Sequence, residues 1–122
     1  MTHPSQSLDE VVHQRHRLGI LTVLAEGKRV QFGFLQDLLG LTDGNLSRHL
    51  QILEEAGYVA IEKGYEGKRP RTWATITKSG RRALDAEMRI LSELLHHAGD
   101  QKATDTLRPS RSPKVLAPRP IP

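Results

Sequence analysis

The sequence contains no cysteine. This absence excludes a disulfide framework, a thiolate zinc site, a redox dithiol and a cysteine nucleophile. Aromatic residues are scarce, with two Phe, two Tyr and one Trp among 122 residues, so we expect a core built mainly from Leu, Ile, Val and Ala. No apolar run approaches the roughly 18 residues that a membrane span needs, and the polar start of the chain does not resemble a signal peptide. We therefore expect a cytoplasmic protein.

Positive charge is concentrated near one end of the chain. Residues 1–99 hold 13 basic and 12 acidic side chains, whereas residues 100–122 hold five basic and two acidic ones and five of the seven prolines. Such a final segment cannot bury enough apolar surface to offset the entropy of ordering it. The sequence thus predicts a flexible arm over residues 1–6, one domain over 7–98 and a disordered basic tail over 99–122.

Local signals predict three helices in the first half of the domain. Ser7 and Glu10 have the spacing of a capping box, so we expect the first helix to begin there and to run to about residue 25, where Gly27 ends it. A second, short helix is predicted over 33–39, after residues 30–32 that suit either a brief strand or an irregular segment. Thr42 has the position of an N-cap for a third helix over 43–56, in which leucines recur with helical spacing at 46, 50 and 53.

The apolar period then changes from helical to alternating. Residues 58–62 and 72–76 are predicted strands, joined by a glycine-containing loop over 63–71, and Thr77 is the expected N-cap of a last helix over 78–98 that ends at Gly99. Three helices, a hairpin and a long helix indicate a mainly α protein with an α+β winged helix-turn-helix fold.

The sequence resembles a known family at two places. Residues 41–59, LTDGNLSRHLQILEEAGYV, resemble the recognition-helix signature of ArsR/MarR-type bacterial transcriptional regulators, and residues 69–81, RPRTWATITKSGR, resemble their wing strand and the start of the next helix. The resemblance covers roughly residues 10–92 and implies a dimeric regulator that binds double-stranded DNA. Repression is the expected mode of regulation.

The third helix offers polar side chains suited to DNA contact. Arg48 can pair with guanine, and Asn45 or Gln51 can read adenine. Hydroxyl groups at Thr42 and Ser47 suit phosphates, and Gly44 permits close backbone approach. His49 lies beside the apolar stripe, so it could contact DNA or pack against the protein. The basic residues of the predicted loop, which would meet phosphates or a minor groove, are Lys63, Lys68, Arg69 and Arg71. Trp73 is expected to pack in the core or within the hairpin, in preference to stacking on a base.

The last helix has a wider apolar stripe than a small core requires. We expect this stripe to form a homodimer interface, with residues Leu84, Met88, Leu91, Leu94 and Leu95.

The sequence also bears on functions other than DNA binding. No catalytic motif or phosphate-binding glycine loop is present, so neither an enzyme nor a cofactor is expected. A winged helix used for protein interaction remains an alternative, as does a metal-responsive regulator whose candidate ligands would be His13, His16, Glu93, His96 and His97. The sequence leaves open whether a small-molecule effector is bound, and it is equally compatible with a constitutive DNA binder.

Overall fold

The computed structural model describes residues 3–101, and the predicted tail lies almost entirely outside them. It contains a short 3-10 helix, four α-helices and three strands within this range. The helices are η1 Pro4–Ser7, α1 Arg15–Glu26, α2 Phe32–Leu39, α3 Asp43–Glu55 and α4 Lys78–Gln101, and the strands are β1 Val30–Gln31, β2 Val59–Glu66 and β3 Arg69–Ile76. The order confirms the predicted α+β winged helix fold.

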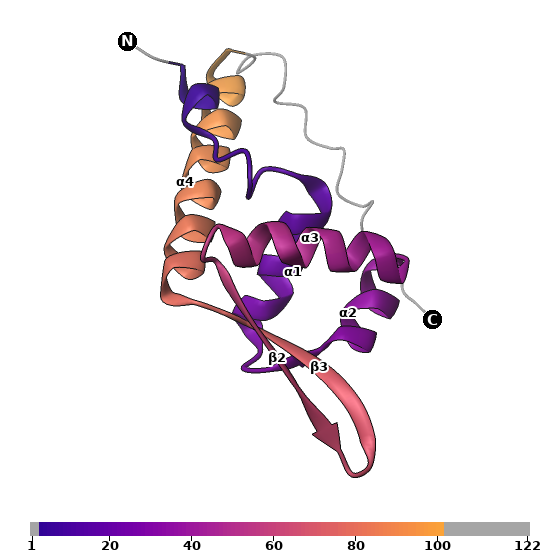
Figure 1. Ribbon diagram of the computed structural model, residues 1–122. Helices are drawn as coiled ribbons and strands as arrows, with labels where there is room; N and C mark the ends of the chain where they lie inside the picture. The colour runs from indigo at the N-terminus through magenta and orange to yellow at the C-terminus, as the bar shows by residue number, and fades with distance from the viewer. Residues whose placement is uncertain (1–2, 102–122) are drawn as a thin grey trace.

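The sheet is antiparallel and is largely a projecting hairpin. Its strand order is β1-β3-β2, with Val30 paired to Ala74 and Val59 paired to Ile76. The brief strand that the sequence allowed at residues 30–32 is therefore present as β1. Figure 1 shows the far end of β2 and β3 extending away from the helices, with α4 on the opposite side of the molecule from α2.

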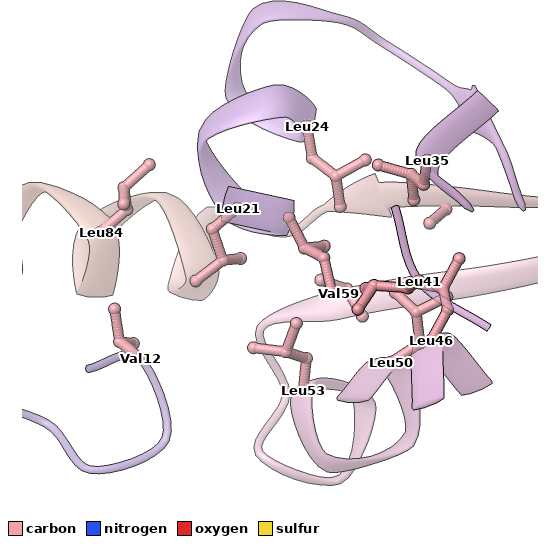
Figure 2. Close-up of a cluster of buried hydrophobic side chains, with 12 residues drawn as sticks. Val12, Leu21, Leu24, Leu35, Leu41, Leu46, Leu50, Leu53, Val59 and Leu84 are labelled. Atoms are coloured by element: carbon pink, nitrogen blue, oxygen red, sulfur yellow. The ribbon is translucent and has the colours of Figure 1, made fainter. Parts of the chain in front are cut away.

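The core is aliphatic, as the scarcity of aromatics predicted. Its buried hydrophobic residues are all Leu, Ile, Val or Ala. α1 supplies its centre through Ile20, Leu21 and Leu24, and α3 turns Leu46 and Leu53 inward. Figure 2 shows the leucines of α2 and α3 at one end of this cluster and Val12 with Leu84 at the other. Because this core contains side chains from both α3 and α4, it fixes the position of one helix relative to the other.

The predicted start of the first helix is wrong. α1 begins at Arg15, with Gln14 as its N-cap, and Ser7 belongs to the preceding 3-10 helix. The amides of Val11 and Val12 donate instead to the Asp9 carboxylate, at 2.8 and 3.4 Å. This Asp9 turn replaces the expected capping box.

Three other boundaries differ from the predictions. α4 continues past Gly99 to Gln101, and η1 includes residues 4–6 of the predicted flexible arm. Most of the predicted loop 63–71 is strand, because the ladder continues to the pair Glu66–Arg69. Only Gly67 and Lys68 form the turn, and the φ of +67° at Gly67 suits a two-residue hairpin turn.

Candidate nucleic-acid interface

α3 is fixed at its start by local contacts that the sequence signalled. The Thr42 hydroxyl accepts the Asn45 amide at 3.1 Å, which confirms the predicted N-cap. Gly40 adopts a left-handed conformation after α2, with φ of 66°. The Gln36 side chain of α2 donates to the Asp43 carboxylate at 2.6 Å. These contacts set the angle between the two helices of the helix-turn-helix.

One face of α3 is open to solvent. Leu46, Leu50 and Leu53 are buried, and the opposite side exposes most of the predicted contact residues: Thr42, Gly44, Asn45, Ser47, Arg48 and Gln51. The Gln51 amide group donates to Glu55 at 3.3 Å. Acidic Glu54 and Glu55 occupy the C-terminal end of the helix, so the surface best suited to a polyanion is its N-terminal half.

His49 lies apart from this open face. It is half-buried, and its Nδ1 is 3.2 Å from the Arg17 guanidinium of α1. Burial, followed by the charges of Arg17, His16 and Arg48, lowers the pKa of the His49 imidazole below 6.5. Of the two roles allowed by the sequence, the structure therefore favours packing against the protein.

The basic residues of the hairpin are spread along it instead of gathering at its tip. Lys68 is in the turn and Arg69 follows it, both exposed. Arg71 forms an ion pair with Glu66 at 3.0 Å, which neutralises part of its charge. Lys63 lies farther back on β2, where it lines a hollow of about 260 Å³ with Ser47 and Gln51 of α3. Lys63 is thus the basic residue of the hairpin that lies beside the open face of α3.

Of the two packing positions that the sequence allowed for Trp73, the structure has the hairpin. The Arg29 guanidinium lies over its ring, 4.1 Å from the centroid, and Arg29 also pairs with Glu62 at 3.4 Å. Gly64 sits against the ring on the neighbouring strand, where a Cβ atom would come within 3.2 Å of it. The indole therefore braces the hairpin, and a role in base stacking is not favoured.

A buried polar group that the sequence did not reveal links α4 to the start of the chain. Glu87 is only 1% exposed, and its carboxylate contacts the Asp9 amide at 3.3 Å and His13 Nδ1 at 2.7 Å. Asp9 in turn accepts the Tyr58 hydroxyl at 2.7 Å. Glu87 is three residues after Leu84 and so interrupts an apolar stripe, which is the signal that could have suggested its burial.

The candidate metal ligands are separated in the single chain. His13 is held by Glu87, and the His16 ring lies 5.4 Å from that of His49. The His97 ring is 5.4 Å from that of His3. Within residues 3–99, whose side chains are described, no three His, Asp or Glu residues form a group that could hold a metal ion, and the remaining candidates, Glu93 and His96, are exposed.

The apolar stripe of α4 is divided between the core and the surface. Leu84 is 6% exposed and packs in the core, so its assignment to a dimer interface is wrong. Met88 is 39% exposed and Leu95 is 74% exposed, with Leu91 and Leu94 half-buried between them. No helix among the described residues is both long and apolar enough to cross a membrane.

Comparisons with known proteins agree with this architecture. The family model of a winged helix DNA-binding domain matches residues 16–95. An uncharacterized protein of Methanocaldococcus jannaschii is 42% identical over 65 residues, which cover 53% of this chain and 71% of the relative.

Two solved structures share most of the fold. A transcriptional regulator homologue from Pyrococcus horikoshii OT3 has a TM-score of 0.74 and 27% identity, covering 80% of this chain and 98% of that one. A protein assigned to the MarR family of transcriptional regulators, from Enterococcus faecalis V583, has a TM-score of 0.60 and 29% identity, covering 81% and 84%. The chain belongs to the winged helix DNA-binding domain family, and its architecture is that of MarR-like transcriptional regulators.

Proposed function

We propose that the protein is a sequence-specific transcriptional repressor that binds double-stranded DNA as a homodimer on an inverted-repeat operator. The observation that carries this proposal is the exposed N-terminal half of α3, which Lys63 connects to the basic hairpin. In this arrangement α3 enters the major groove, and the hairpin, or wing, contacts the backbone or the adjacent minor groove. Operator binding would place the protein on the nucleoid.

The exposed contact residues of α3 and its N-cap each have a role in the proposed complex. Arg48 presents a guanidinium that can bind guanine through two hydrogen bonds, and Asn45 or Gln51 can read adenine. The Thr42 hydroxyl accepts the Asn45 amide and still has its own proton to donate to a phosphate oxygen. Ser47 can bind a second phosphate, and Gly44 carries no side chain that would hold the backbone away from DNA.

The proposed dimer rests on the exposed part of α4. This helix has 24 residues, so it is about 36 Å long, and Met88 and Leu95 lie on it with large exposed fractions. Pairing of two copies along this apolar surface would remove it from water. A twofold dimer would present two α3 helices to half-sites one helical turn apart, about 34 Å. Occupancy of such a site would block access by other proteins, which supports repression.

Selection of bound duplexes from a random DNA library tests the proposal. We expect enrichment of an inverted repeat with half-sites one turn apart. Arg48→Ala should weaken binding to the selected duplex by about 1–3 kcal/mol and relax the preference at one base pair of each half-site. Arg89→Ala, which removes an exposed charge from α4, is the matched control and should retain the preference.

The same experiment separates the proposal from its main alternative. Equal loss on selected and random duplexes would make Arg48 a phosphate contact instead of a base contact. Failure of the wild type to enrich any duplex would contradict DNA recognition. It would favour a protein-interaction module, for which the exposed Phe34 and Leu38 of α2 provide an apolar surface at 56% and 55% exposure.

A further inference from the structure

The segment Leu8–Gln14, here named the N-terminal strap, lies between η1 and α1 in the sequence. Side-chain contacts link it to α4 on one side and, through Arg17 of α1, to α3 on the other. It has no regular helix, and the Asp9 carboxylate stabilises its turn through the amides of Val11 and Val12. The Val12 side chain is fully buried in the core. The strap is therefore a fixed element of the fold.

One side of the strap is attached to α4. The buried Glu87 carboxylate accepts the Asp9 amide through Oε1 and contacts His13 Nδ1 through Oε2. The Tyr58 hydroxyl also donates to Asp9, at the start of the hairpin. A buried carboxylate requires such partners, since an unpaired one would be costly. Movement of α4 at Glu87 would therefore move the strap.

The other side of the strap is attached to α3 through a single guanidinium. Arg17 donates from Nε to the Val11 carbonyl at 2.6 Å and from Nη2 to the Glu10 carbonyl at 3.4 Å. Its Nη1 is 3.2 Å from His49 Nδ1 on α3. Because arginine can only donate, this nitrogen of His49 must accept, which requires a neutral imidazole with its proton on Nε2.

We propose that Arg17 is a positioning residue for DNA recognition, which locks α3 to the N-terminal strap and, through Glu87, to α4. This role rests on the proposed function. In the proposed dimer α4 sets where the second copy lies, so the strap would transmit that placement to the surface that reads DNA. Contacts to base edges demand close hydrogen-bond geometry, whereas phosphate contacts tolerate small displacements. Loss of Arg17 should therefore reduce specificity more than general affinity.

Arg17→Gln tests the proposal, with Arg15→Gln as the matched control. Arg15 is exposed in the same turn of α1, so both variants lose one charge from the same place. On the duplex selected by the wild type, Arg17→Gln should lose affinity about tenfold more than Arg15→Gln, while both should lose equally on a random duplex of the same length. Arg17→Lys keeps the positive charge, but an ammonium group cannot make the three contacts of the guanidinium with Val11, Glu10 and His49. This variant should therefore lose specificity as Arg17→Gln does. Equal behaviour of the Arg17 and Arg15 variants on both duplexes would overturn the role.

The pH dependence of specificity provides a readout that a purely structural role would not move. The charged groups that face His49 are Arg17 and His16 from α1 and Arg48 from α3. Because the pKa of His49 is lowered, protonation of its imidazole requires a pH below 6.5, and acidification through that pKa removes the acceptor for Arg17. The ratio of selected to random binding should fall in the wild type and in His16→Gln, but should be nearly flat in Arg17→Gln. A fall of the same size in Arg17→Gln would contradict the proposal.

Hydrogen exchange of the free protein tests the positioning role without DNA. Arg17→Gln should accelerate exchange in the strap and in residues 43–55 relative to Arg15→Gln. If the wild type selects no duplex, the proposed function fails, and unchanged exchange in these segments would then also reject the positioning role. If the wild type selects a duplex and only the Arg17 predictions fail, the proposed function stands without this role.

Discussion

Gly80 lies where α4 passes against the backbone of Tyr58, just before the hairpin. Its amide donates to the Thr77 hydroxyl at 2.9 Å, and that hydroxyl donates to the Gly57 carbonyl at 2.7 Å. A Cβ atom at Gly80 would overlap the carbonyl oxygen of Tyr58, which is backbone and cannot move aside alone. Gly80→Ala should therefore destabilise the fold by about 1–3 kcal/mol, as measured by urea unfolding.

Gly99→Ala is the matched control for this prediction. Gly99 lies in the same helix, and a Cβ there would meet nothing within 4 Å. Alanine should be neutral or slightly stabilising at that position, because it has the higher helix propensity. Equal effects at the two positions would show that helix propensity alone accounts for Gly80.

Tyr58 supplies a contact whose contribution to stability depends on pH. Its hydroxyl donates to Asp9, and this hydrogen bond, with burial, raises the pKa of the Tyr58 phenol above 10.0. A raised pKa means that the bond stabilises the fold below pH 10 and that this stability is lost as the pH rises through the pKa of the folded state. Tyr58→Phe should cost about 0.5–1.5 kcal/mol at neutral pH.

Urea unfolding of the wild type and Tyr58→Phe at a series of pH values checks this expectation. The difference between the two proteins should begin to shrink above about pH 10, where the phenol of the unfolded state ionises, and should be lost as the pH rises through the higher pKa of the folded state. Tyr65→Phe, on the wing where the ring is 72% exposed, is the control and should have little effect. A difference that stays constant with pH would mean that the hydroxyl group contributes no hydrogen bond to Asp9.

The residues that the sequence identified correctly are those with local partners. Thr42 caps a helix three residues from the amide that it accepts, and Gly27 is the C-cap directly after α1. Glu87 could not be placed in this way, because its partner Asp9 is 78 residues distant. The spacing of Glu87 after Leu84 places it on the apolar side of the helix, but a buried carboxylate also needs hydrogen-bond donors, and sequence spacing within one helix does not identify them.

The elements of the structure were predictable in type and order, and less so in extent. The capping box at Ser7 was a valid local option, but the turn at Asp9 is reinforced by Glu87 and Tyr58 from distant parts of the chain. The outer half of the hairpin reads as a loop in the sequence because it contains glycines and charged residues without an alternating apolar pattern, and in the structure most of these residues are exposed. Strand pairing continues there through backbone hydrogen bonds, which leave no mark on the apolar pattern.

The wing gives an element-scale prediction about charge. Each phosphate contact that is lost should reduce the slope of log affinity against log salt by about one. Lys68→Ala and Arg69→Ala should each flatten this slope, since both side chains are exposed at the turn. Arg71→Ala should change it less, because the Glu66 carboxylate already neutralises part of that charge at 3.0 Å.

Titration of a random duplex at several salt concentrations measures these slopes directly. Lys78→Ala, at the start of α4, is a control that removes an exposed charge outside the wing. If Arg71→Ala flattened the slope as much as Arg69→Ala, the ion pair with Glu66 would have to break when DNA binds. If none of the wing variants changed the slope, the wing would not contact phosphates.

At the scale of the whole molecule, exposed apolar side chains lie on α4 and, across the core from it, on α2 (Figure 1). The sequence predicted an apolar excess on α4 but assigned Leu84 to it, because a helical stripe does not reveal which of its residues meet the chain's own core. Val12 in the strap covers that end of the stripe. The dimer therefore remains a prediction, now narrowed to the outer residues Met88, Leu91, Leu94 and Leu95.

Leu95→Glu tests the dimer most directly, since Leu95 is 74% exposed and its replacement should leave the monomer fold intact. A twofold interface contains the side chain twice, so a charge there should raise the dimer dissociation constant by about 100-fold or more. Leu38→Glu makes the same exchange on α2, at 55% exposure, and should not change the oligomeric state. Sedimentation equilibrium measures both.

The DNA-binding consequence of this variant distinguishes assembly from recognition. A monomeric Leu95→Glu protein should bind a full inverted repeat little better than a single half-site, because the two α3 surfaces are no longer linked. Its preference among half-site sequences should be unchanged, since Arg48 and the rest of the open face of α3 are on a different helix. If Leu95→Glu remained dimeric, the interface would lie on another surface. Loss of the dimer in Leu38→Glu, which otherwise serves as the control, would then place it on α2.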